Sequence, residues 1–481
     1  MHRQGAINSY KIQAILDTLK LMIDELIDET IRRIEATEGS SRSRAEKPKV
    51  SFDYAVRHIL LELWKASKCI PAGEVSINKR SGYYSEQNER YRDTLLTYKQ
   101  TKAAFEGLVK IGFIEITQKG YFDRESSEGE VTRIIAADEL RERLNEVPGH
   151  PAVALKPDLS RETILLRARI DGHRVLVDYE DTDNTDKYRN NLYIINSCFA
   201  KHWFDLEVLD KEMPILEDRI ASQSTKEPID LSKRTLVRIF SNGSFKEGGR
   251  FHLGWWQNLP SDYRKYITID EKRTGEGDFS QLNPHMLYFA NNKELGSEDA
   301  YDRVLDGQHR SVVKQAFNAM VQANTPLKSC PKTIDLSEVD ISWSELRDRI
   351  LRSHKPIAHE FFNGVGNKLQ FKDSTIAEKV MLHFAEMDVP ALPVHDSFVI
   401  HHGYAESGEM EEAMRRAFHE TFGESIKVSE EMIDWQYRKN QSDTDEITPL
   451  SMNQISKADD DVSQWRHRHS EWYKKRFQQE N

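Results

Sequence analysis

Near its N-terminus the chain has apolar side chains at helical spacing. Residues 10–36 place isoleucine, leucine and methionine three and four positions apart, which predicts one long amphipathic helix ending at Gly39. The following stretch, Ser40 to Lys49, has no apolar period and predicts a linker. The apolar face of the helix could pack against the rest of the chain, or it could mediate self-association or bind a partner protein. The sequence alone leaves both alternatives open.

Residues 50–145 combine helical patterns with strand patterns. Helices are expected over Tyr54–Ala66 and Tyr98–Ile111, and two short strands follow them, Phe113–Ile116 and Val131–Ile135. Two helices and a β-hairpin in this order are typical of a winged helix-turn-helix, which we predict for this segment.

The second of these helices has a polar face that could enter the major groove of DNA. Lys99 and Lys102 lie on that face, and basic residues slightly outnumber acidic ones around it. Contact with nucleic acid through these lysines is one interpretation, and docking of another protein is the other.

The rest of the chain divides by pattern as well. A strand pair, Leu165–Ile170 and Val175–Asp178, and a helix over Thr185–His202 predict a connector. A final helix over Trp465–Phe477 follows a polar, acidic stretch. The expected segments are a helix with its linker (1–49), the winged helix-turn-helix (50–145), a thumb-like connector (146–230), the segment richest in specific motifs (231–430) and a polar tail (431–481).

Composition narrows the class of protein. The chain has 481 residues, 38% of them hydrophobic, and no apolar run long enough to span a bilayer. Its first residues lack the apolar stretch of a signal peptide, so we expect a cytoplasmic protein without membrane contact. Its net charge of −11 argues against a protein coated in positive charge, but not against a local basic groove. The far-apart Cys69, Cys198 and Cys330 predict reduced thiols, with neither a disulfide framework nor a thiolate zinc site.

Two aspartates stand at the tips or ends of predicted hairpins. Asp278 ends a strand that follows the apolar segment Tyr266–Ile269 and a polar turn through Glu276. Asp396 lies between two apolar strand fragments, in the sequence His-Asp-Ser. Either alone is most often a turn residue. Together on one sheet, they could hold two divalent ions about 3.5–4 Å apart, which is the arrangement for in-line phosphoryl transfer.

A helix between the two aspartates carries a cationic stripe. Arg310, Lys314 and Asn318 are spaced by four residues, which places them on one helix face. Such a stripe could grip a triphosphate, although a solvated helix face is the ordinary explanation for Arg and Lys at these positions. The order of all three features is what favours the functional interpretation.

These motifs resemble family A DNA polymerases and the single-subunit RNA polymerases of phage and mitochondrial type. The match runs from Gly248 to about Gly423. The motif around Asp396 ends in Ser-Phe, which is closer to the RNA enzymes. The segments that carry the resemblance are Gly249-Arg250-Phe251, Asp278-Phe279-Ser280-Gln281, Arg310 with Lys314, and His395-Asp396-Ser397-Phe398.

The resemblance implies an α+β right-hand polymerase, with an antiparallel palm sheet, helical fingers and a thumb, preceded here by the winged helix-turn-helix. It implies that Asp278 and Asp396 bind two Mg²⁺ ions, for which Mn²⁺ could substitute, with the backbone carbonyl of Phe279 as a further ligand. Lys314 would protonate the pyrophosphate leaving group, and His395 would hold the primer end. The expected partners are primer–template DNA and dNTPs or NTPs.

The resemblance also implies two sets of binding residues. The nucleotide would contact Phe279, Ser280, Gln281, Asn283, Arg310, Lys314 and Asn318. The nucleic acid would contact Arg250 and Arg264, in addition to Lys99 and Lys102 of the winged helix.

The sequence departs from both polymerase families at the nucleotide pocket. Five residues after the first aspartate, the DNA enzymes carry a glutamate that excludes the ribose 2′-OH, and the RNA enzymes carry glycine. This chain has Asn283, which could crowd a 2′-OH or form a hydrogen bond with it. On the fingers helix, where an aromatic is expected, the chain has Asn318 and Gln322; Phe317 could substitute only if the helix is rotated or bulged.

Three functions stay open at this point. The favoured one is a DNA-directed DNA polymerase without a proofreading domain, because no carboxylate cluster precedes the motifs and the first motif lacks the glycine of the RNA enzymes. A single-subunit-type RNA polymerase or an untemplated terminal transferase is the first alternative. A DNA-binding regulator or replication initiator with a degenerate palm is the second.

Overall fold

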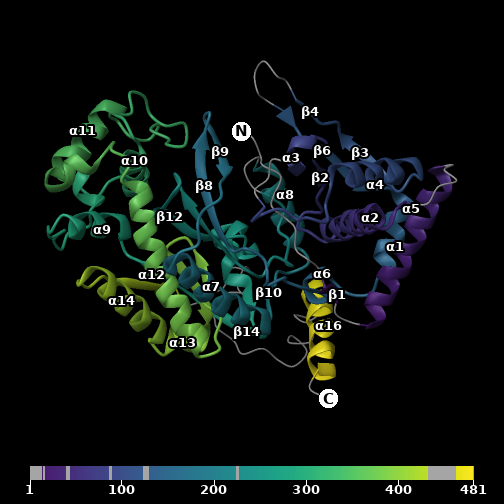
Figure 1. Cartoon of the computed structure of the whole chain (residues 1–481). Coiled ribbons are helices and arrows are strands. Elements are labelled where there is room, and N and C mark those ends of the chain that lie inside the picture. The colour runs from purple at the N-terminus through teal and green to yellow at the C-terminus, as the bar shows by residue number, and fades with distance from the viewer. Residues whose placement is uncertain are drawn as a thin grey trace.

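The computed structural model describes residues 13–14, 17–38, 44–85, 89–122, 129–223, 227–431 and 462–479. It is a mixed α and β structure with largely antiparallel sheets. The buried residues form two large hydrophobic clusters, one from Ile23 to Leu155 and the other from Ile70 to Trp472. Figure 1 shows the N-terminal helices on one side and the elements of the larger cluster on the other. Within the described ranges, no helix combines the length and apolar composition that crossing a bilayer requires.

The first helix, α1 (Asp17–Glu38), packs against its own chain. Its isoleucines at 23, 27, 31 and 34 are buried against α2 (Glu46–Ser67) and α4 (Tyr98–Lys110). A Cβ on Gly107 of α4 would lie 2.4 Å from the Ile34 side chain, so the glycine permits this close helix crossing. Of the two alternatives for the described part of this helix, packing against the chain is the one observed.

Two expected boundaries near the N-terminus are wrong. Gln13–Ala14 form strand β1, which pairs with β7 (Leu155–Lys156), so the helix does not extend back through them; residues 10–12 and 15–16 lie outside the described part. The expected linker through Lys49 overlaps α2, which begins at Glu46. Pro48 stands in the first turn of α2, where a missing N–H breaks no helical hydrogen bond. The proline is therefore compatible with the helix.

Around α4 the chain forms a small sheet. Its strands are β2 (Val75–Ile77), β6 (Thr132–Ala136) and β3 (Ile114–Gln118), in that spatial order, and β2 was absent from the sequence prediction. The other elements of this segment are α3 (Ser81–Ser85), β4 (Tyr121–Phe122), β5 (Gly129–Glu130) and α5 (Asp138–Glu146).

A second sheet joins the expected connector to the segment after it. Its order is β12 (Ser244–His252), β11 (Val237–Ser241), β8 (Ile164–Ile170) and β9 (His173–Leu176). Strands from both sides of residue 230 therefore share one sheet. The helices of this region are α6 (Pro151–Ala154), α7 (Asp183–Lys201) and α8 (Met213–Ser222).

The third sheet, here called the central sheet, carries the site. Its order is β10 (Phe204–Leu206), β13 (Ile267–Ile269), β14 (Lys272–Phe279), β16 (Ser397–His401) and β15 (Leu392–Val394), and β17 (Val428–Glu431) also pairs with β14. Only Asp270 and Glu271 form the turn before β14, so the expected polar turn through Glu276 is mostly strand. Because a Cβ on Gly277 would lie 2.8 Å from Met410, the glycine allows helix α14 (Glu409–Phe422) to lie against β14.

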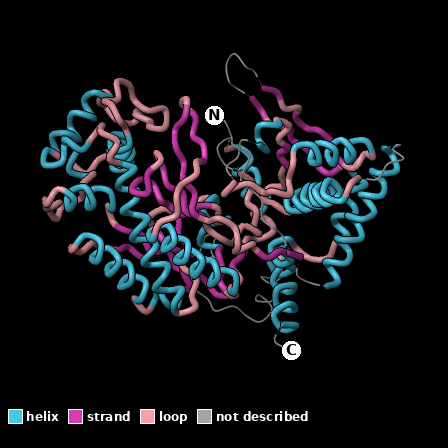
Figure 2. Tube along the Cα trace, in the orientation of Figure 1, coloured by secondary structure: helices cyan, strands magenta, loops and turns pink. Residues whose placement is uncertain are grey.

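Helices cover the rest of the larger cluster (Figure 2). α12 (Gly366–Glu386) packs against β12, α14 and α7. α9 (Leu282–Ala290), α10 (Arg310–Gln322) and α11 (Trp343–Ser353) form a group around the buried His354, and α13 (His402–Glu406) follows β16. The last helix, α16 (Ser463–Gln479), is anchored by a buried ion pair of 3.0 Å between Arg468 and Asp205.

Candidate active site

Asp278 and Asp396 meet at one end of the central sheet. Asp278 is the penultimate residue of β14, and its register partner on the antiparallel strand β16 is Ser397. Asp396 immediately precedes that serine, in the two-residue turn between β15 and β16. The fold therefore brings together two aspartates that are far apart in sequence.

Burial beside a second carboxylate determines the electrostatics of Asp278. Burial and the neighbouring charge of Asp396 raise the pKa of Asp278 to about 7, although Lys314 lowers it. Its Oδ1 is buried and has no hydrogen-bond partner within the described residues. A buried carboxylate oxygen left in this state is costly unless a cation accompanies it.

Several hydrogen bonds hold the turn that carries Asp396. Trp256 donates its indole N–H to the carbonyl of Pro393 at 2.9 Å. The Ser397 hydroxyl lies 3.0 Å from the carbonyl of Val394 and 2.6 Å from a carboxylate oxygen of Glu276. These contacts fix both ends of the turn, so the position of Asp396 does not depend on its own side chain.

His395 occupies the first position of the same turn, with a φ of +58°. Solvent reaches its side chain. Partial desolvation, followed by the charge of Arg250, lowers the pKa of His395. The imidazole is therefore mainly neutral at pH 7, and one ring nitrogen can accept a hydrogen bond.

The face of α10 that carries Arg310, Lys314 and Asn318 lies beside its buried face of Val313, Ala316 and Phe317. Arg310 donates to a carboxylate oxygen of Asp299 at 2.7 Å, and Asp302 is 3.9 Å away. Lys314 is exposed and lies close enough to Asp278 to influence its titration.

Of the expected nucleotide-pocket residues, Ser280 and Gln281 lie in the turn from β14 into α9, and Asn283 lies in the first turn of α9. Asn283 donates to the side-chain oxygen of Asn318 at 2.9 Å, so the two amides form one unit. Gln281 has a φ of +54°, and its side-chain oxygen accepts from the backbone N–H of Ala300. The backbone N–H of Ser280 donates to the carbonyl of Lys427 at 2.9 Å.

Two aromatic residues near the site belong to the core. The Phe279 ring packs against Phe418, with ring centres 6.2 Å apart, so only the Phe279 backbone could contribute a ligand. Phe317 is fully buried against Tyr301, His354 and Phe361, and the helix is not turned to expose it. It does not provide a surface on which a base could stack.

Arg250 is fixed by its own ion pair and by the backbone of the residue before it. Its guanidinium contacts Asp373 of α12 at 2.7 Å, and burial raises the pKa of Asp373 to about 6 although Arg250 opposes that rise. The preceding Gly249 has a φ of +79°, and its carbonyl accepts from the buried Arg238 at 2.9 Å. Arg238 also pairs with Glu378 at 2.8 Å, so it ties β11, the β12 bulge and α12 together.

Of the remaining residues that were expected to contact nucleic acid, one lies near the two aspartates and two lie far from them. Arg264 forms an ion pair with Glu276, two residues before Asp278 on the same strand face. Lys99 and Lys102 are exposed on α4, a helix whose buried side belongs to the smaller hydrophobic cluster. Figure 1 shows α4 on the opposite side of the molecule from α10. The fold does not bring these two lysines to the site.

Three acidic residues of the site were absent from the sequence prediction: Glu276, Asp299 and Asp373. Glu276 could have been inferred, because alternate residues of a strand share a face and Asp278 was already placed on it. Asp299 lies in an irregular segment, and Asp373 lies in a helix remote in sequence, so no local pattern indicated either one.

Comparison with known proteins gives little information about the family or function of this chain. No family model matches the sequence, and no curated protein matches it. One solved structure that resembles the chain is the POL domain of Pol1 from M. smegmatis in complex with DNA primer–template and dNTP. The likeness has 11% sequence identity and a TM-score of 0.29, and it covers 87% of this chain and 66% of that chain, just under two thirds. A likeness this distant does not establish a shared function, so the geometry of the site has to carry the assignment.

Proposed function

We propose that this protein is a template-directed nucleic-acid polymerase that transfers nucleotides with two divalent ions, and that its substrates are dNTPs. The observation that carries the proposal is the buried carboxylate oxygen of Asp278 beside Asp396, which has no hydrogen-bond partner in the described part of the chain, with a cationic helix face next to the pair. The order of the three motifs along the chain supports the same conclusion.

The residues present fit a pair of Mg²⁺ ions. Oxygen ligands are what Mg²⁺ prefers, and the orphaned oxygen of Asp278 is the acceptor that a cation would satisfy. Asp278, Asp396 and the backbone carbonyl of Phe279 would hold the ions. When bound, such a pair activates the attacking 3′-hydroxyl and stabilises the leaving oxygen of an in-line displacement.

The chain's own side chains have separate tasks in this proposal. Arg310 leaves Asp299 and pairs with phosphate oxygens of the incoming nucleotide. Lys314, one helical turn further on, contacts the same phosphates and donates a proton to the departing pyrophosphate. His395 positions the primer end, and the Asn283–Asn318 pair lies where the sugar is selected.

The architecture is assigned accordingly. The central sheet serves as the palm, and α9, α10 and α11 serve as the fingers. Residues 146–230 supply the thumb-like connector, apart from β10, which belongs to the central sheet. The elements α2, β2, α3, α4, β3 and β6 follow the order of a winged helix-turn-helix, which we propose as a second contact to nucleic acid.

The decisive experiment is single-nucleotide incorporation on a primed DNA template, with each dNTP and NTP, in Mg²⁺ or Mn²⁺. Asp278→Asn and Asp396→Asn should each reduce incorporation by about 100- to 1,000-fold or more, because each removes charge that stabilises the transition state. Circular dichroism should show unchanged folding, since neither substitution removes packing. Asp340→Asn, at an exposed carboxylate, is the matched control and should be fully active.

Each outcome has a clear meaning. Incorporation that follows the template base supports a templated polymerase, and addition regardless of template indicates the terminal transferase. Exclusive use of NTPs indicates the RNA polymerase. Undiminished incorporation by either aspartate variant refutes the two-metal assignment, and DNA binding without any incorporation favours the regulator.

A further inference from the structure

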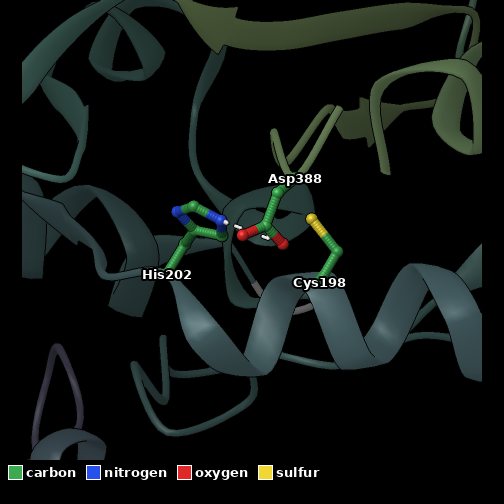
Figure 3. A group of neighbouring side chains, drawn as sticks. All are labelled: Cys198, His202 and Asp388. Atoms are coloured by element: carbon green, nitrogen blue, oxygen red, sulfur yellow. Dashed lines mark ion pairs between the residues drawn. The ribbon is translucent and has the colours of Figure 1, made fainter. Parts of the chain in front are cut away.

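A cysteine, a histidine and an aspartate converge at the C-terminal end of α7, away from the two aspartates of the proposed active site. Cys198 and His202 are one helical turn apart, and Asp388, just after α12, faces both of them (Figure 3). One ligand atom from each residue lies within 4.8 Å of the others. Cys198 is buried, His202 is half-buried and Asp388 is exposed, so the group lies just beneath the surface.

The imidazole of His202 is oriented by a second carboxylate. Its Nδ1 is 2.6 Å from Asp270, in the turn between β13 and β14, and Asp270 also accepts the backbone N–H of Trp203 at 2.9 Å. Because an ionised carboxylate can only accept, Nδ1 carries the proton in this contact. The other nitrogen, Nε2, is then aimed at Asp388.

The contact between Nε2 and Asp388 is not a hydrogen bond. The distance from Nε2 to Oδ1 of Asp388 is 3.8 Å, and Nε2 is buried without a hydrogen-bond partner among the described residues. Two ligands of a tetrahedral zinc ion, each about 2.0 Å from the metal, are separated by about 3.3 Å. The observed gap therefore needs to close by only a few tenths of an ångström to bridge a metal.

We propose that Cys198, His202 and Asp388 bind one Zn²⁺ ion, with Asp270 as the carboxylate that orients the histidine. Thiolate, imidazole and carboxylate together suit Zn²⁺ and exclude Mg²⁺, which prefers oxygen ligands. A histidine that donates its other ring proton to a carboxylate is the common arrangement around protein-bound zinc. The site is independent of the proposed polymerase activity.

The ion would join three elements: the end of α7, the end of α12 and, through Asp270, the turn between β13 and β14 of the central sheet. Lys201 donates to Oδ1 of Asp388 at 2.8 Å, so this lysine must share or release the carboxylate when the metal binds. Without metal, Asp270 and Cys198 outweigh the effect of burial and raise the pKa of His202 to about 10. Binding of the ion therefore requires the Nε2 proton of His202 to leave.

The test uses the full-length protein, stripped with a chelator and titrated with Zn²⁺ in competition with a chromophoric chelator, and separately with Co²⁺. We expect one ion per chain, and with Co²⁺ the near-ultraviolet charge-transfer band of a thiolate–cobalt bond. Cys198→Ala and His202→Gln should abolish the band. Asp270→Asn should weaken Zn²⁺ binding by about 10- to 100-fold, as loss of an orienting carboxylate does. Cys330→Ala, at a half-buried thiol outside the cluster, is the matched control.

Two results would overturn the proposal. One is the absence of stoichiometric Zn²⁺ binding by the parent protein, which would leave a protonated His202 bridging Asp270 and Asp388 as the explanation of the cluster. The other is an unchanged cobalt band in Cys198→Ala. Primer extension in Mg²⁺ by Cys198→Ala should equal that of the parent, so failure here and failure of the proposed function are distinguishable.

Discussion

Arg310 lies in an ion pair with Asp299, although the proposed function requires it to bind phosphate. Asp299 is itself oriented by backbone N–H groups of Tyr301 and Asp302, which hold its other oxygen. The Asp299 carboxylate pairs with the Arg310 guanidinium, so it competes with the phosphates of a substrate for that guanidinium. At the scale of the residue, the state of the site depends on such local competitors.

Asp299→Asn should therefore lower the KM for the incoming nucleotide. A partly exposed pair of this kind is worth up to about 1 kcal/mol, which corresponds to a decrease of about two- to fivefold. Steady-state kinetics on a primed template measures it, and Asp302→Asn should have a smaller effect in the same direction, because the Asp302 carboxylate is 3.9 Å from Arg310 and not in hydrogen-bond contact with it. A raised KM would show that Asp299 instead positions the arginine for phosphate.

Sugar selection is predicted to depend on Asn283 and on the amide that holds it. If the enzyme favours dNTPs, Asn283→Gly should admit NTPs, and Asn283→Glu should keep or sharpen the preference. Asn318→Ala should shift the ratio in the same direction as Asn283→Gly but less, because it only frees the Asn283 amide from its 2.9 Å hydrogen bond. If the enzyme favours NTPs, Asn283→Gly should cost about 1 kcal/mol, the net value of one hydrogen bond.

The measurement is incorporation efficiency for matched dNTP and NTP pairs with each variant. An unchanged ratio in both Asn283 variants would mean that this position is not the gate. The correspondence of the first motif beyond Ser280 would then have to be abandoned.

At the scale of the element, α4 is the helix of the N-terminal segment that we propose to contact nucleic acid. Its apolar face is committed to α1 and α2, while Lys99 and Lys102 are exposed. Deleting residues 50–145 would strip the partners from the buried face of α1, so such a deletion confuses loss of contact with misfolding. Charge reversal on the exposed face avoids this problem.

Lys99→Glu and Lys102→Glu should each weaken DNA binding across sequences and reduce the slope of log affinity against log salt by about one, because each phosphate contact releases about one counterion. Fluorescence anisotropy at several salt concentrations measures the slope. Lys47→Glu, exposed in the first turn of α2, is the control. Unchanged slopes in both variants would make this segment a protein-docking module.

At the scale of the whole molecule, His354 joins α9, α10 and α11, and α10 is the helix that carries the cationic face. It is fully buried, and its ring lies against Phe317 and Phe361. Its Nε2 lies 3.0 Å from the carbonyl of Ala300, which can only accept, so Nε2 is protonated and Nδ1 accepts from the Tyr288 hydroxyl at 3.1 Å. Burial lowers the pKa of His354 to about 4, so the folded protein keeps this ring neutral.

This histidine should make the protein acid-labile. Between about pH 6.5 and pH 4 the unfolded chain binds a proton that the folded chain does not, so the contribution is complete above pH 6.5 and is lost as the pH falls, by about 3 kcal/mol in total. His354→Gln should be less stable than the parent at pH 7 but should lose less stability toward pH 4. Urea unfolding across this range measures the difference, with the exposed His359→Gln as control. Parallel pH curves for the parent and His354→Gln would contradict the assignment.

The sequence by itself determined the features that depend on neighbours along the chain. The stripe on α10 follows from helical periodicity, and a turn at Asp396 follows from short apolar strands on either side, although Ser397, expected in that turn, begins β16. Where local signals conflict, the same reasoning failed. Polar residues 272–276 form a strand because pairing with β13 and β16 satisfies their backbone. Pro48 stands in the first turn of a helix because Phe52 and its apolar neighbours bury the rest of that helix.

Only the tertiary structure decided which distant groups meet. The pairing of Arg310 with Asp299, of Arg250 with Asp373, and of Cys198 and His202 with Asp388 joins residues from separate elements. No periodicity encodes these contacts, because they depend on how helices and sheets pack once their apolar faces are buried. The sequence thus identified the two aspartates, and the fold brought them together and buried one of their oxygens, which has no hydrogen-bond partner among the residues that the structure describes.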